Sequence, residues 1–284
     1  RNPVIQVFNS YFDATMTFTM GGGDVTWRAS IEYPIGGTRY QATKNGSSTM
    51  TVLAAESFQR FDPIPGLVIP AGAAFKVRYW NSLLVGSFYI NSNGGCLSSL
   101  GDAISGGAIA GQPDQTASGG PTAANLAFGA PVWVLGYAPS GTKSALILGD
   151  SIDAGANEDA AFTGDAGGNI GAGARWLAGK GYNALNISRA TTRASHWAAA
   201  DLSGLLTWLS GSSFTAKFCG LGRNDYSNGN AASTIASDVA TALAKLPSTP
   251  ITVVRDAPPT TSSSDSWATV DNQTRDATQT TRET

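Results

Sequence analysis

The segment Ser144–Ile152 places a short apolar run directly before a glycine and a serine, in the order Ser-Ala-Leu-Ile-Leu-Gly-Asp-Ser-Ile. An uninterrupted apolar run of this length is typical of a strand covered on both faces in a parallel sheet. Gly149 gives the backbone freedom for a tight exit from that strand. We therefore expect Ser151 at the carboxyl end of a strand, where open α/β sheets bind their ligands. A helix starting at Asp153–Gly155 would turn its free N–H groups toward the serine hydroxyl.

A second apolar run, Phe218–Gly220, leads into Gly-x-Asn-Asp at residues 222–225. Gly-Asp-Ser alone also forms ordinary turns. Together, however, Gly-Asp-Ser-Ile and Gly-x-Asn-Asp resemble the first and third blocks of the SGNH (GDSL-type) serine hydrolases. The resemblance covers about residues 144–270. It implies a three-layer α/β sandwich with a parallel sheet, serine ester hydrolase (esterase) activity, and no metal or organic cofactor.

The resemblance also assigns site residues. Ser151 is the nucleophile, which needs a general base and donors for the oxyanion. The donors are the backbone N–H of Ser151, a backbone N–H of the second block, and the side-chain amide of Asn224. In the second block, residues 186–192, Arg189 stands where the family has glycine. Any residue except proline keeps the backbone donor. The alternatives are a turn residue for Asn224 and a solvated surface arginine for Arg189.

The fourth block of the family, Asp-x-x-His, is missing from this sequence. No histidine follows Asp256, and the only histidine is His196. His196 falls at the start of the helix expected after the second block, so it is either the base or a residue on the rim or surface of that helix. We expect a second chain or a C-terminal fragment to supply Asp-x-x-His beside the strand at 251–255.

The hydrophobic pattern divides the chain into two domains. Residues 1–140 contain alternating polar and apolar segments between Gly- and Pro-rich turns, which predicts a β-sandwich of the jelly-roll type. These segments are 15–20, 25–33 and 74–80, with a last strand at 132–137 and a loop or linker at 94–121. Residues 141–284 alternate strands with helices, which predicts a parallel sheet. The expected strands are 145–148, 182–187, 214–220 and 251–255, and the expected helices are 195–209 and one with Ile235, Val239 and Leu243 on a single face.

Charge and composition exclude several classes of protein. The net charge is −2 and only 13% of residues are charged, which argues against nucleic-acid binding and against a polybasic membrane surface. No apolar run is long enough to span a bilayer. With two cysteines and one histidine there is no zinc-type ligand set, and Cys219 is expected to be a small buried hydrophobe. The many Gly, Ser, Thr and Ala residues are common in exported bacterial proteins and suggest a secreted, cell-surface or periplasmic location.

Two functions from different classes fit these observations. The first is a serine esterase that hydrolyses acyl esters, with acetyl favoured, of a carbohydrate or similar polar substrate through an acyl-enzyme on Ser151. The alternative is a non-catalytic carbohydrate-binding or surface-assembly protein with a degenerate SGNH-like half. Four aromatic residues of the β half either form a sugar-stacking face or fill the sandwich core, and we favour the core: Trp27, Tyr33, Tyr40 and Trp80.

Overall fold

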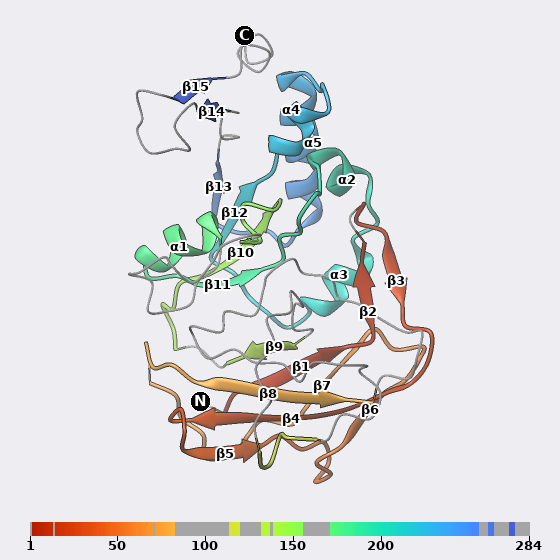
Figure 1. Ribbon diagram of the computed structural model, residues 1–284, viewed down its shortest axis with the longest axis vertical. Coiled ribbons are helices and arrows are strands. Elements are labelled where there is room, and N and C mark those ends of the chain that lie inside the picture. The colour runs from red at the N-terminus through yellow and green to blue at the C-terminus, as the bar shows by residue number, and fades with distance from the viewer. Residues whose placement is uncertain are drawn as a thin grey trace. The chain divides into compact units, whose positions relative to one another are not determined.

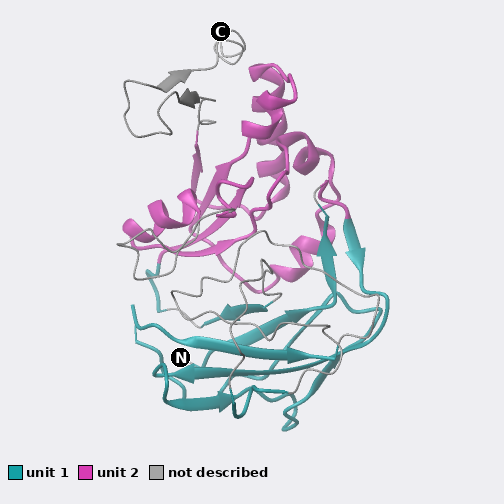
Figure 2. Cartoon of the chain, viewed as in Figure 1, with its two compact units in different colours: residues 1–13, 18–142, 157–169 teal, residues 14–17, 143–156, 170–284 magenta. Residues whose placement is uncertain are grey.

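The computed structural model describes residues 2–13, 15–70, 72–82, 114–119, 132–136, 139–155 and 171–255, and two short strands, β14 (Thr261–Ser263) and β15 (Gln273–Arg275). Antiparallel β-sheets come first in the chain, and a parallel four-strand sheet with helices follows (Figure 1). The chain divides into two compact units (Figure 2). Unit 1 comprises residues 1–13, 18–142 and 157–169, and unit 2 comprises residues 14–17, 143–156 and 170–284.

Unit 1 is built from antiparallel strands. One sheet has the order β7–β1–β9, and a second is centred on β4, which pairs with β5, β6 and β8. A separate pair joins β2 to β3. The strands predicted at 25–33, 74–80 and 132–137 are confirmed, with small shifts at their ends. The bounds are β1 (Val4–Phe8), β2 (Ser10–Phe12), β3 (Phe18–Met20), β4 (Val25–Tyr33), β5 (Thr38–Gln41), β6 (Met50–Val52), β7 (Phe58–Arg60), β8 (Lys76–Asn81) and β9 (Val132–Leu135).

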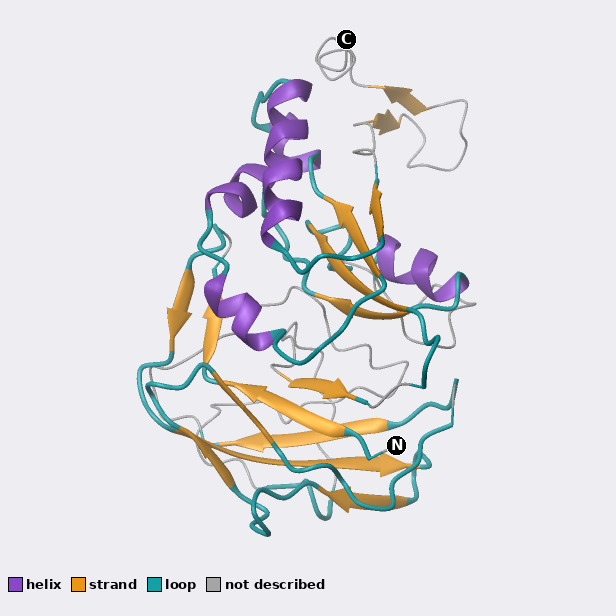
Figure 3. Cartoon of the chain, turned by 180° about the vertical axis from the view of Figure 1, so that it is seen from behind, coloured by secondary structure: helices purple, strands orange, loops and turns teal. Residues whose placement is uncertain are grey.

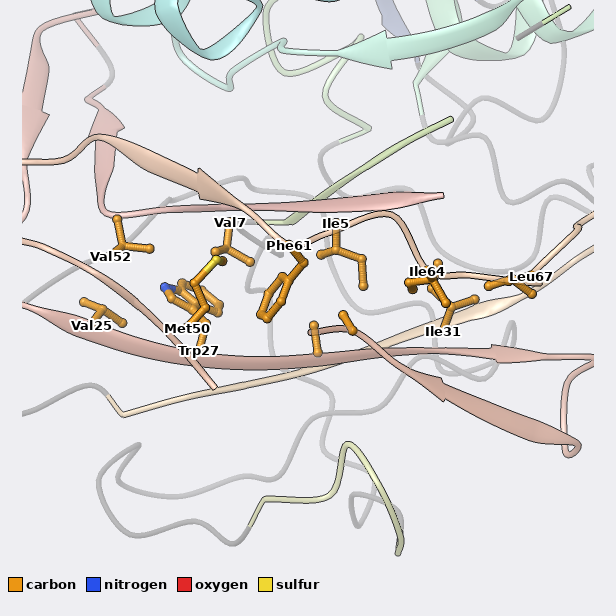
Figure 4. Close-up of a cluster of buried hydrophobic side chains, with 12 residues drawn as sticks. Ile5, Val7, Val25, Trp27, Ile31, Met50, Val52, Phe61, Ile64 and Leu67 are labelled. Atoms are coloured by element: carbon orange, nitrogen blue, oxygen red, sulfur yellow. The ribbon is translucent and has the colours of Figure 1, made fainter. Parts of the chain in front are cut away.

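The core of unit 1 takes side chains from both larger sheets (Figure 4). Alternate residues of β4 point into it, because successive side chains of a strand face opposite sides. Trp27 and Ile31 of β4 are buried there with Ile5 of β1. Tyr33 and Tyr40 pack against the same cluster. Three of the four aromatic residues considered for sugar stacking therefore face the core, as favoured from the sequence.

The opposite face of β4 holds a segment of the predicted linker. Asp114 forms an ion pair with Arg28 at 2.9 Å, and the Ser30 hydroxyl donates to the carbonyl of Thr116 at 2.7 Å. Thr116 is 1% exposed. Residues 114–119 are thus anchored to the sheet by specific polar contacts, whereas the rest of the predicted linker at 94–121 lies outside the described residues.

The sheet of unit 2 has the order β11–β10–β12–β13, and all four strands are parallel (Figure 3). Their bounds are β10 (Ser144–Gly149), β11 (Asn183–Asn186), β12 (Ala216–Gly220) and β13 (Ile251–Val254). Residues 145–148 of the central strand β10 are all 0% exposed, which confirms a strand covered on both faces. Strand β13 lies at an edge of the sheet as described, and its Ile251 and Val254 are 45% and 52% exposed.

Five helices are described in unit 2: α1 (Ala172–Gly179), α2 (Ala194–Ala199), α3 (Ser203–Trp208), α4 (Arg223–Ser227) and α5 (Ala232–Lys245). The apolar stripe predicted for α5 is confirmed, since Ile235, Val239 and Leu243 are buried. None of the helices in these ranges has the length and apolar composition needed to cross a bilayer.

The prediction of one helix over 195–209 is wrong, because the chain breaks into α2 and α3. Ala200 has extended backbone angles, φ −61° and ψ 145°, and Asp201 Oδ1 accepts the Ser203 N–H at 2.9 Å to start α3. Lys245 of α5 also donates from Nζ to the carbonyl of Ala200 at 2.8 Å. A cation at the end of α2 stabilises the free carbonyls and the helix dipole there. The break is therefore stabilised by a residue distant in sequence.

Candidate functional site

Ser151 lies in a turn at the carboxyl end of β10, as predicted. Asp150 Oδ1 accepts the Ile152 N–H at 3.0 Å, and the Asp150 carbonyl accepts the Ala154 N–H at 2.9 Å. These two bonds define the turn, and Ser151 is half-buried within it. Residues 151–155 form no helix, so the helix expected directly after Ser151 is not present there. We call residues 150–155 the Ser151 turn.

The next described helix, α1, directs its first N–H groups at the Ser151 turn rather than at the hydroxyl of Ser151. The Gly173 N–H donates to Asp153 Oδ1 at 3.0 Å, and the Ala172 N–H donates to the Ile152 carbonyl at 3.3 Å. Free N–H groups at a helix start favour a negative charge nearby. The start of α1 therefore stabilises the Asp153 carboxylate.

The second block, at 186–192, is hydrogen-bonded to the end of β10. The Arg189 N–H donates to the carbonyl of Gly149 at 3.0 Å, and the Thr192 hydroxyl donates to the carbonyl of Arg189 at 2.7 Å. The N–H group of Arg189, which the resemblance assigns to an oxyanion, thus already has an acceptor in this structure. Thr191 has a φ of 67°, an uncommon conformation for a β-branched residue that marks a constrained loop.

The third block meets the second through Asn224, the second residue of α4. Asn224 Nδ2 donates to the carbonyl of Thr192 at 2.8 Å. Thr192 is 0% exposed, and its hydroxyl and carbonyl connect Asn224 to Arg189, which is itself bonded to Gly149 at the end of β10. A side-chain amide carries two hydrogens, so this bond leaves one for another acceptor. The structure therefore brings all three blocks to the same edge of the sheet.

Asp225, next to Asn224, has a role that the sequence analysis did not assign. Its side chain is buried, with Oδ2 accepting the Ala194 N–H at 2.7 Å and Oδ1 the Ser195 N–H at 3.4 Å. It therefore caps the start of α2, while Lys245 binds the other end of that helix. Two charges from distant parts of the chain hold α2 in place.

The only histidine, His196 of α2, accepts a hydrogen bond from the residue just before that helix. Arg193 Nε donates to His196 Nε2 at 3.0 Å. A general base must offer the lone pair of a ring nitrogen to the proton it accepts. In this conformation the Nε2 lone pair of His196 faces a guanidinium donor instead.

Asp153 and Arg255 form a buried ion pair that sequence analysis missed. Arg255 Nη1 donates to Asp153 Oδ1 at 3.1 Å, and Nη2 lies 3.0 Å from Oδ2. Asp153 is 0% exposed, and its carbonyl accepts Asn186 Nδ2 at 2.7 Å. Both residues follow strands of a parallel sheet, whose carboxyl ends meet at one edge, and this placement was the available signal.

Three glycines have no room for a side chain because of Asp153. A Cβ atom on Gly149 would lie 2.4 Å from Asp153 Oδ2, and one on Gly220 would lie 1.7 Å from the same oxygen. A Cβ on Gly171, which has a φ of 91°, would lie 1.9 Å from the Asp153 carbonyl. Bare backbone at these positions lets the Ser151 turn pack directly against β10, β12 and the start of α1.

Cys219 lies in the buried strand β12. It is free and 0% exposed, as expected from its apolar strand. Burial raises the pKa of the Cys219 thiol to about 11. The reactive form of cysteine is the thiolate, which is scarce at neutral pH when the pKa is this high.

Asp150, immediately before Ser151, has a raised pKa. Burial is the main cause, and the hydrogen bond from the Ile152 N–H and the charges of Arg255 and Arg223 oppose it. Asp150 is 0% exposed, and its Oδ2 has no hydrogen-bond partner among the described residues. The pKa of Asp150 is therefore higher in the folded protein than in the unfolded chain. The contribution of Asp150 to the free energy of unfolding is fully present below the unfolded pKa and is lost as the pH rises through the folded pKa.

We expect Asp150→Asn to become relatively more stable than the wild type as pH rises. Asparagine keeps an oxygen acceptor for the Ile152 N–H but cannot ionise. Urea unfolding of both proteins at pH 4 and pH 8 checks this. The free energy of unfolding of the variant, relative to that of the wild type, should be higher at pH 8 than at pH 4. Asp201→Asn is the control, because the hydrogen bond from the Ser203 N–H lowers the pKa of Asp201. This variant should become less stable relative to the wild type as the pH rises. An equal stability difference at both pH values for Asp150→Asn would contradict the assignment.

Comparison with known proteins identifies no family for this chain: no family model and no curated protein match its sequence. Among the described residues, no group of three or more His, Cys, Asp or Glu side chains is arranged to hold a metal ion. The candidate site is therefore characterised by its own geometry. It consists of a serine in a tight turn, a side-chain amide on the neighbouring strand's exit, and a buried ion pair.

Proposed function

We propose that this protein is a serine esterase of the SGNH-hydrolase type. It removes acyl groups, with acetyl the first to test, from a carbohydrate or similar polar substrate. The observation that carries the proposal is the hydrogen-bonded path from Gly149 of β10 through Arg189 and Thr192 to Asn224. We further propose that unit 1 is a jelly-roll-like β-sandwich, that unit 2 is a three-layer sandwich, and that the enzyme acts outside the cytoplasm, as the composition suggests.

In the proposed reaction, Ser151 Oγ attacks the ester carbonyl carbon while a base takes the hydroxyl proton. The tetrahedral intermediate carries a negative oxygen, which the Ser151 N–H and the second amide hydrogen of Asn224 bind. The alcohol leaves with a proton returned by the same base, and water then hydrolyses the acyl-enzyme. Arg189 is left out of the oxyanion donors because its N–H already binds the Gly149 carbonyl.

We place the base on a histidine of an Asp-x-x-His segment carried by a second chain or a C-terminal fragment. His196 is a poor candidate because its Nε2 accepts a hydrogen bond from Arg193. We propose that this segment pairs with β13, which is an edge strand among the described residues and whose Ile251 and Val254 are 45% and 52% exposed. Unpaired apolar strand edges are usually covered in native proteins.

Labelling with a fluorophosphonate probe tests the proposal, because the probe reacts with activated serines. We expect the natively purified protein, with any associated chain retained, to take up one label per chain, located at Ser151 by peptide mass spectrometry. Heat-denatured protein is the control and should stay unlabelled. A label at another residue would show that Ser151 is not the nucleophile.

The second candidate is a non-catalytic carbohydrate-binding or surface-assembly protein. Two observations favour it. The first is that His196 accepts a hydrogen bond from Arg193. The second is Trp80 of β8, which lies opposite Arg28 of β4, with the guanidinium carbon 5.7 Å from the centre of the Trp80 ring. Because alternate residues of a strand face opposite sides, this pair lies on the face of β4 away from the core. Native protein that resists the probe but binds polysaccharide would support this candidate over the esterase.

A further inference from the structure

We infer that Arg255 is a positioning residue that sets the spacing between Ser151 and Asn224, the two groups that would act on the ester in the proposed function. Arg255 follows the last residue of β13, and its backbone N–H continues the ladder to β12 by donating to the Cys219 carbonyl at 2.8 Å. This bond fixes where the side chain begins. The inference rests on the proposed esterase activity and assigns to Arg255 a role that the resemblance does not imply.

The guanidinium of Arg255 binds the two neighbouring segments at once. On one side it pairs with Asp153, two residues after Ser151, through contacts of 3.1 and 3.0 Å. On the other side Nη2 donates to the carbonyl of Gly220 at 3.0 Å, four residues before Asn224. A change in this one side chain therefore acts on both the Ser151 turn and the segment that leads to the proposed oxyanion donor.

The surroundings make this contact rigid. Asp153 is 0% exposed and the side chain of Arg255 is 22% exposed. The carboxylate is also held by the Gly173 N–H at 3.0 Å. The planar guanidinium meets a carboxylate and a carbonyl in fixed directions, which the single ammonium of lysine cannot reproduce.

We expect Arg255→Met to lower kcat roughly 10- to 100-fold per folded molecule, with KM changed less than about twofold, because misplacement by about 1 Å can cost on the order of 10²-fold in rate. Arg255→Lys should recover part of the loss, since it keeps a charge beside Asp153. The matched control is Arg78→Met in unit 1, which removes a partner of the buried Glu32 at 2.6 Å. It should lower stability but leave kcat unchanged.

A double-mutant cycle with Asn224→Ala separates positioning from a general loss of structure. If Arg255 acts by placing Asn224, the effects of Arg255→Met and Asn224→Ala on kcat will be less than additive, whereas those of Arg78→Met and Asn224→Ala will add. Full additivity, or an unchanged kcat in Arg255→Met, would overturn the inference.

Two further outcomes are distinct. If Arg255→Met does not fold, Asp153→Asn tests the same contact, because it keeps the shape and removes the charge. Loss of folding in both variants would overturn the positioning role and make the pair an element of the fold. A wild-type protein that neither turns over esters nor reacts with the probe would instead refute the proposed function itself.

Discussion

Replacing Ser151 by alanine is expected to abolish ester hydrolysis, with kcat falling on the order of 10⁶-fold, while the protein stays folded. The hydroxyl oxygen is the atom that forms the acyl-enzyme, so its removal leaves only background catalysis by the oxyanion donors. The same hydroxyl contributes little to stability, because it makes no hydrogen bond with the residues the structure describes. Turnover of an acetyl ester and urea unfolding of the same preparation measure the two effects.

Asn224→Ala is the comparison variant for this experiment. Removing one oxyanion donor costs about 10²–10³-fold in kcat with little change in KM. This variant should still react with the fluorophosphonate probe at Ser151, more slowly than the wild type, whereas Ser151→Ala should not react there at all. If Ser151→Ala kept most of the hydrolytic activity, another residue would have to be the nucleophile.

Gly220→Ala is expected to destabilise unit 2 severely. The added Cβ would lie 1.7 Å from Asp153 Oδ2 and 2.8 Å from Arg255 Nη2. Neither atom is free to move away, since the two side chains pair with each other and Nη2 also binds the Gly220 carbonyl. Overpacking a core costs about 1–3 kcal/mol, and breaking a buried ion pair costs about 3–5 kcal/mol. We therefore expect the free energy of unfolding of Gly220→Ala to fall by about 3–5 kcal/mol.

Gly179→Ala is the matched control, because it makes the same chemical change at a glycine of the same unit. Gly179 ends α1, and nothing lies within 4 Å of the position its Cβ would take. An alanine there should leave stability unchanged or raise it by about 0.5–1 kcal/mol through helix propensity. Urea unfolding of both variants measures the contrast. If Gly220→Ala were as stable as Gly179→Ala, the Asp153 side chain would not occupy the place beside β12 described above.

The sequence alone was enough to predict the elements whose signal is local. The apolar run at 145–148 indicated a strand covered on both faces, and the spacing of Ile235, Val239 and Leu243 indicated the buried face of α5. Such periodicities arise from the geometry of one strand or one helix. Parallel strands end at a common edge, so Ser151 and Asn224, which each follow a predicted strand, could be expected at that edge. That their strands, β10 and β12, are neighbours was decided by the sheet topology.

Only the tertiary structure decided what depends on residues far apart in the chain. The break between α2 and α3 is stabilised by Lys245, and α2 begins at the carboxylate of Asp225. Asp153 and Arg255, separated by 102 positions, meet beside two glycines, Gly149 and Gly220, that leave space for the Asp153 carboxylate. A local pattern carries no information about which distant charge fills a buried space. Burial makes an unpaired charge costly, and so the folded chain selects the partner that its backbone brings within reach.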